Sequence, residues 1–183
     1  MKSIELMVKE HENVTRIIKV ARKLCYKIVK NEDVDYDNFY KVADFIQNYA
    51  DKIHHNKEEG FLFNKMMDEM GKVAEKLVKH GMLVEHDLGR LYVSELLEAL
   101  ESYKNGNDEA RVDIIGSTIS YTNLLTRHIE KENNVVYKFA EKSLSEETKK
   151  EIEENCEKFE KENAKNKEKY LQILDELEKK LEA

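Results

Sequence analysis

Apolar residues recur at helical spacing along almost the whole chain, and they predict an all-α fold. Over residues 4–30 the stripe includes Ile4, Met7, Val14 and Ile18, which predicts an amphipathic helix. Comparable stripes predict three more helices, at about residues 36–70, 72–104 and 108–141. Short connections separate these segments, so adjacent helices are expected to run antiparallel. The pattern therefore predicts an up-down-up-down four-helix bundle.

The C-terminal segment 143–183 follows a different pattern. It begins with SLSEE, in which Ser145 is the expected N-cap of a long helix. Charged residues dominate this helix, and its apolar positions are sparse until the end. We therefore divide the chain into a bundle, residues 1–142, and a charged helix, residues 143–183. This helix is expected to pack on the outside of the bundle or against a second copy, which would make a homodimer.

Histidine and glutamate pairs interrupt two of the apolar stripes. His54 and Glu58 lie four residues apart, and His128 and Glu132 repeat the spacing. On a helix such a pair projects from one face, so both side chains can bind one ion. Two such pairs on separate helices indicate a metal site that crosses the middle of the bundle.

Two further histidines fall on the other two helices at a matching depth. His11 and His86, like His54 and His128, lie about 18–20 residues from the loop that joins their helix to its neighbour. At about 1.5 Å per residue, antiparallel packing brings all four imidazoles to one level. Imidazole and carboxylate donors suit iron, zinc or manganese, and four imidazoles with bridging carboxylates suit a pair of ions.

The composition argues against some classes of binding partner and against some cellular locations. The chain has 31 Lys and Arg against 38 Asp and Glu, a formal net charge of −7, whereas nucleic acids bind to clustered positive charge. No apolar run approaches the roughly 20 residues of a membrane span, and none resembles a signal peptide. We therefore expect a cytoplasmic protein without nucleic-acid or membrane partners. Cys25 is expected to be buried and Cys156 exposed, too far apart in the chain to form a CxxC site.

Four segments together resemble the hemerythrin-like (HHE cation-binding) domains: KEHENV, HHNKEEGFLF, MLVEHDLGR and HIEKENNVVY. They occur in the family's order and cover residues 4–141. The resemblance implies a four-helix bundle that holds a non-haem di-iron centre, with zinc or manganese as substitutes, and that binds a small diatomic ligand, O2 or NO. Carried over by motif, the metal ligands are His11, His54, Glu58, His86, His128 and Glu132, with Glu58 and Glu132 as the bridging carboxylates.

The chain departs from the animal oxygen carriers of that family in two places. They place a further histidine one turn before the position of His86, where this chain has Met82. Their last carboxylate is an aspartate five residues after its histidine, whereas Glu132 follows by four. Candidates to fill the gap at Met82 are Glu85, Glu59, His55 and Tyr121. On a regular helix His55 and Glu59 point about 100° away from His54 and Glu58, so we expect them around the site or on the surface.

Three functions are compatible with these residues. The first is a protein that binds or responds to oxygen, nitric oxide or oxidants. The second is a di-iron oxidoreductase or iron-repair factor, which would need an external electron donor because the chain has no internal Cys motif for one. The third is a metal-free helical interaction protein with incidental core histidines. The sequence does not choose between sensing, storage and turnover, so catalysis stays an open question.

Overall fold

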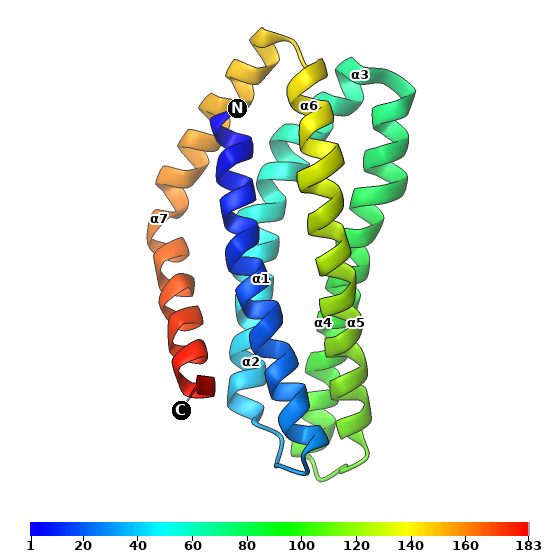
Figure 1. The fold of residues 1–183 in the computed structure, drawn as a ribbon, viewed down its shortest axis with the longest axis vertical. Helices are drawn as coiled ribbons and strands as arrows, with labels where there is room; N and C mark the ends of the chain where they lie inside the picture. The colour runs from blue at the N-terminus through cyan, green and yellow to red at the C-terminus, as the bar shows by residue number, and fades with distance from the viewer. Residues whose placement is uncertain (183) are drawn as a thin grey trace.

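The structure, a computed structural model, describes residues 1–182, so residue 183 of the predicted C-terminal segment lies outside the described residues. Four long rods form a bundle and a fifth helix lies along one side, which confirms the predicted all-α fold (Figure 1). The helices are α1 (Lys2–Val29), α2 (Tyr36–Phe45), α3 (Asn64–Leu77), α4 (Leu83–Lys104), α5 (Ala110–Lys131), α6 (Tyr137–Ser143) and α7 (Glu146–Glu182). Within residues 1–182 no helix has both the length and the apolar character that a membrane crossing requires.

Gly71 divides the second rod from the third. The helical hydrogen bonding of α3 runs through this residue, but its φ of 67° and ψ of −157° break the helix. A residue with a side chain is strained at this φ, whereas glycine adopts it readily. The second rod therefore runs from α2 to the first part of α3, and the third from the rest of α3 to α4. The break falls between the helices predicted at about residues 36–70 and 72–104.

Wider π-helical turns interrupt three of the four rods. In these turns an N–H bonds to the carbonyl five residues earlier, so each turn holds more residues than in an α-helix. The segments are Ile46–His55, Glu58–Phe63, Val78–Met82 and Glu132–Val136. They carry or adjoin the histidines and glutamates singled out above, and π turns of this kind are frequent at functional sites.

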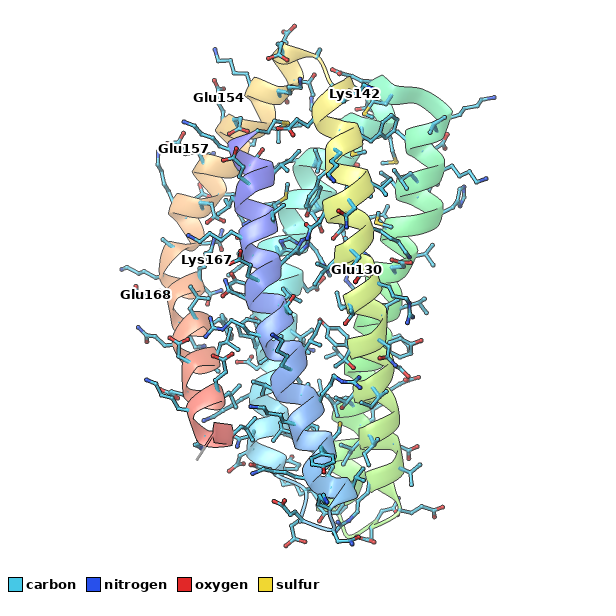
Figure 2. All side chains as sticks on the ribbon, in the orientation of Figure 1. Glu130, Lys142, Glu154, Glu157, Lys167 and Glu168 are labelled. Carbon is cyan, nitrogen blue, oxygen red and sulfur yellow. The ribbon has the colours of Figure 1, made fainter. Side chains whose placement is uncertain are left out.

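The C-terminal helix α7 packs along α1 and α2 (Figure 1). The Ser145 hydroxyl accepts a hydrogen bond from the Thr148 N–H at 3.2 Å, which confirms the predicted N-cap. Exposed charged side chains such as Glu154 and Glu168 cover its outer face (Figure 2). The exposure predicted for Cys156 is wrong: its thiol side chain is 3 % exposed, because it faces the bundle from this helix.

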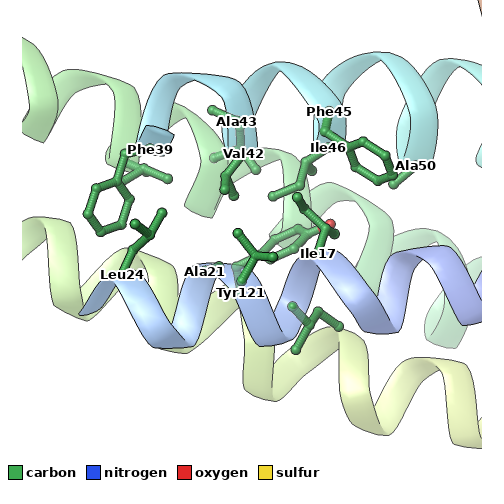
Figure 3. Close-up of a cluster of buried hydrophobic side chains, with 14 of the residues drawn as sticks. Ile17, Ala21, Leu24, Phe39, Val42, Ala43, Phe45, Ile46, Ala50 and Tyr121 are labelled. Carbon is green, nitrogen blue, oxygen red and sulfur yellow. The ribbon is translucent and has the colours of Figure 1, made fainter. Parts of the chain in front are cut away.

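The apolar core consists of two clusters separated by a polar layer. One cluster lies around the α1–α2 contact, where Ile17 and Leu24 face Phe39 and Val42 (Figure 3). The other gathers α3, α6 and the first turns of α1 around Phe63. Apolar residues on either side of these histidines and glutamates in the sequence belong to different clusters. Ile53 belongs to the first cluster and Leu62 to the second, and Val14 and Met7 are divided in the same way.

Candidate metal centre

All four rods contribute buried histidine or glutamate side chains to the polar layer. The residues are His11 from α1, His54, His55 and Glu58 from the second rod, His86 from α4, and His128 and Glu132 from the fourth rod. Each is 6 % exposed or less. The structure thus brings together the six residues selected from the sequence and adds His55.

The Glu132 carboxylate lies between two histidines. Its Oε2 is 3.2 Å from His11 Nε2, and its Oε1 is 3.1 Å from His128 Nε2. Glu58 lies between another two: its Oε2 is 3.6 Å from His54 Nε2 and 3.5 Å from His86 Nε2. Each carboxylate therefore lies within 3.6 Å of two histidines, which come from different rods.

These side chains form two donor groups that share Glu58. One group is His11, His54, Glu58 and Glu132, and the other is His55, Glu58, His86 and His128. In each group, one ligand atom per residue lies within 4.8 Å of the others.

The spacing of the donor atoms matches the spacing of ligands around a metal ion. Nitrogen ligands bind a transition metal at about 2.1 Å, so two ligands at right angles are about 3.0 Å apart. His86 Nε2 and His128 Nε2 are 3.1 Å apart, and His128 Nε2 and Glu132 Oε1 are also 3.1 Å apart. In the metal-free protein a protonated His128 can donate this contact to His86 as a hydrogen bond, and the same spacing allows both nitrogens to bind one cation.

The sequence model of the Hemerythrin HHE cation binding domain matches residues 2–140. The chain belongs to this hemerythrin family. Neither a curated protein nor a solved structure matches the chain. The match covers the whole four-rod bundle, and this hemerythrin domain carries a histidine and glutamate cluster able to hold a metal.

The five histidines of the hemerythrin centre are oriented in the same way. Each Nδ1 is hydrogen-bonded to an oxygen outside the centre, and the Nε2 atoms of His11, His54, His86 and His128 face the two carboxylates. The pairs are His11 with Asn133 (2.8 Å), His54 with Glu10 (3.0 Å), His55 with Asp51 (3.2 Å), His86 with Glu59 (2.6 Å) and His128 with Glu85 (2.9 Å). A carboxylate or amide oxygen accepts, so each Nδ1 carries a proton, and a neutral ring then has its lone pair on Nε2. Metal-binding histidines are typically oriented by such outer partners.

Several inward-facing atoms of the centre lack a hydrogen-bond partner among the described residues. They are His54 Nε2, Glu58 Oε2 and both carboxylate oxygens of Glu132. A buried polar atom without a partner costs roughly 1–3 kcal/mol, and four occur here within one small volume. The distances above place imidazole nitrogens near the oxygens, but without hydrogen-bond geometry. A bound cation would satisfy all four atoms, so the residues present fit a metal.

Burial and neighbouring charges shift the pKa values of the hemerythrin centre in opposite directions. Burial, with the charge of His11, lowers the pKa of His54 to about 4, and burial lowers that of His55 well below its usual value. These imidazoles are therefore neutral at pH 7, as metal binding requires. Burial acts against the charged form of His128 too, but Glu132 and Glu85 outweigh it and raise the pKa to about 9.

The pKa values of the two central carboxylates, Glu58 and Glu132, are also shifted in opposite directions. Burial raises the pKa of Glu58 well above its usual range, and the nearby Glu132 adds to this effect. Burial alone would also raise the pKa of Glu132, but His128, His11 and His86 together hold it well below the usual range. Burial and Glu132 thus favour the protonated form of Glu58, whereas the surrounding histidines keep Glu132 ionised.

One feature of the site was left open by the sequence analysis, and two escaped it. The surface position considered for His55 is wrong, because the π-helical turn over Ile46–His55 directs this residue inward beside His54. The fully buried Lys57, between two ligand-type residues, pairs with Glu10 at 2.5 Å. Tyr137 donates a hydrogen bond to Glu58 Oε1. No pattern in the sequence distinguishes these side chains from ordinary helix residues.

The structure also distinguishes between the residues considered as replacements for the histidine missing at Met82. Met82 itself is buried in an apolar cluster. Glu59 and Glu85 accept hydrogen bonds from the Nδ1 atoms of His86 and His128. They therefore orient these imidazoles and do not replace the missing histidine. Among the described residues Tyr121 belongs to neither donor group, whereas His55 belongs to one.

Proposed function

We propose that this hemerythrin-family protein holds two non-haem iron ions and binds or responds to oxygen, nitric oxide or oxidants. The observation that carries the proposal is the sharing of carboxylates. Glu58 belongs to both donor groups, and Glu132 lies within 3.2 Å of a histidine from each. A carboxylate so placed can bridge two ions, whereas a single ion would leave half of these donors without a partner.

The donor set favours iron, with zinc and manganese as substitutes. Imidazole and carboxylate donors suit all three metals, and no thiolate, which would favour zinc, takes part in either group. Bound iron would supply reversible one-electron chemistry and coordination positions for a small diatomic ligand.

The protein's own residues would control this chemistry in three ways. The bridging carboxylates Glu58 and Glu132 offset the positive charge, and the Tyr137 hydroxyl holds Glu58 in place by donating to its Oε1. The outer partners fix the direction of each imidazole. The apolar clusters on both sides of the layer, including Ile53 and Phe63, exclude bulk water and so restrict access to small uncharged ligands.

The test is the metal content and spectrum of protein purified anaerobically from iron-supplemented cells. We expect two irons per chain, and a near-ultraviolet charge-transfer band that develops on exposure to air or nitric oxide. Glu132→Gln should lower the iron content, because it removes a bridging carboxylate. The matched control is Glu130→Gln on the exposed face of α5, labelled in Figure 2, which should retain both ions.

The remaining outcomes distinguish the rival functions. Tightly bound zinc or a single ion, without spectral change in air, would refute the redox proposal. A metal-free protein with unchanged stability after chelation would support the helical interaction protein instead. Two irons that turn over only when an electron donor is added would point to the oxidoreductase or repair function.

A further inference from the structure

We propose that His55 is a metal ligand, the third histidine of the second donor group, in place of the histidine missing at Met82. The inference rests on the proposed function, since it concerns how the same centre divides its ligands between two ions. It makes the two metal positions unequal.

The immediate surroundings of His55 are those of a ligand. Its side chain is buried, its Nδ1 lies 3.2 Å from Asp51 Oδ1, and a ring nitrogen lies within 4.8 Å of donor atoms of Glu58, His86 and His128. An imidazole with one nitrogen fixed by a carboxylate and the other directed at three further donors has the arrangement of the other four histidines.

The position of His55 relative to His86 supports a shared ion. The two rings are stacked, with centroids 3.8 Å apart and planes 10° apart. Their Nδ1 atoms are held by Asp51 and Glu59, which share Arg90, so the Nε2 atoms of both rings are directed away from Arg90, toward the volume that His128 also faces. The His55 and His128 centroids are 6.1 Å apart and the rings are nearly perpendicular, as expected for ligands on adjacent sides of one ion.

Arg90 fixes the two stacked histidines as a unit. Its guanidinium lies 2.7 Å from Asp51 Oδ1 and 2.7 Å from Glu59 Oε1, the two oxygens that hold His55 Nδ1 and His86 Nδ1. One arginine therefore orients both outer carboxylates, and through them both imidazoles. A histidine that served only as core packing would not require a hydrogen-bond system shared with a ligand.

Counting donors shows the consequence for the centre. The first group offers His11, His54 and the two carboxylates. The second offers three histidines together with Glu58, and Glu132 Oε1 also lies 3.1 Å from His128 Nε2. With His55 bound, the second ion has one more protein donor than the first. The position beside His11 and His54 would therefore have fewer protein donors than the position beside His55 and His86.

The experiment is a titration of metal-free protein with Co²⁺ and, separately, with Zn²⁺ against a competing chelator. Wild type should bind two ions per chain. His55→Gln should weaken one of the two by at least about tenfold and leave the other unchanged, since even changes to the outer partners of ligands cost about 10–100-fold. The visible Co²⁺ bands should change for the weakened ion only. His80→Gln, on an exposed histidine of the same rod as His86, is the matched control and should match wild type.

A second variant keeps the test decisive if His55→Gln folds poorly. Asp51→Asn changes a partly exposed residue that touches His55 directly and is linked to His86 only through Arg90 and Glu59, and it should weaken the same ion by about tenfold. Two ions bound with unchanged affinity in both variants would overturn the assignment and leave His55 as core packing. A wild type that binds no metal would instead refute the proposed function, and the assignment with it.

Discussion

Replacing Lys57 by Met is expected to destabilise the metal-free protein strongly. The Lys57 side chain is fully buried, and its Nζ lies 2.5 Å from Glu10 Oε1 and also pairs with Glu160 on α7. Methionine preserves most of the aliphatic stem but removes the charge. Burial acts to raise the pKa of the Glu10 carboxyl, but His54, Lys57 and Lys167 together lower it to about 2. In the variant this carboxylate loses one of its two ammonium partners.

The magnitude follows from what remains around Glu10. Breaking a buried ion pair by removing one partner costs about 3–5 kcal/mol. Lys167 of α7 still lies 2.6 Å from the same carboxylate oxygen, so the lower end of that range, about 3 kcal/mol, is expected. For a domain of this size each kcal/mol lowers Tm by about 2–4 °C, so Tm should fall by about 6–12 °C.

The assay is urea and thermal unfolding followed by circular dichroism, on protein treated with a chelator. Lys65→Met is the matched control: this lysine pairs with Glu151 at 2.7 Å at the surface, and its loss should cost less than about 1 kcal/mol. Adding Glu10→Gln to Lys57→Met should recover part of the lost stability. A Lys57→Met protein as stable as the Lys65→Met control would show that the buried network does not stabilise the fold.

Three further predictions concern the same bundle. Zinc affinity should rise by about tenfold per pH unit between pH 6 and 8, because the ion must displace the proton that His128 holds up to a pKa of about 9; competition titrations that show no slope would contradict this. Tyr137→Phe should cost the metal-free protein about 1–3 kcal/mol in urea unfolding, since the buried Glu58 carboxyl loses its donor, and unchanged stability would exclude that role. Gly71→Ala should cost about 1 kcal/mol in thermal unfolding because its φ is 67°, whereas a higher Tm would show that the break relaxes freely.

Most of the fold and six of the seven ligand-type residues could be predicted from the sequence because their signals are local. Helical periodicity gives the four rods. The spacing of His54 from Glu58 and of His128 from Glu132 places each pair on one face. The depth of each histidine along its rod then predicts a common layer, and the structure confirms that layer.

The residues that were missed depend on backbone geometry or on a distant partner. His55 points inward only because the π-helical turn changes the period, and the sequence has no clear signal for that turn. Lys57 is buried because Glu10 and Glu160 come from two other helices, and a lysine is rarely so buried. Cys156 was expected to be exposed because charges surround it in the sequence. The domain division at residue 143 and the ligand set stay predictions.

The polar layer between the two apolar clusters also restricts how the helices can align. A core made only of aliphatic and aromatic side chains allows one helix to slide along another by a turn of about 5.4 Å at low cost. Here such a slide would move Glu58 or Glu132 out of the polar layer into one of the apolar clusters and leave a buried carboxylate without any partner. The centre therefore selects one alignment even before a metal binds, as single polar residues do in coiled coils. Replacing both glutamates by leucine should keep the helical circular dichroism but broaden the amide NMR resonances, as several alignments interconvert.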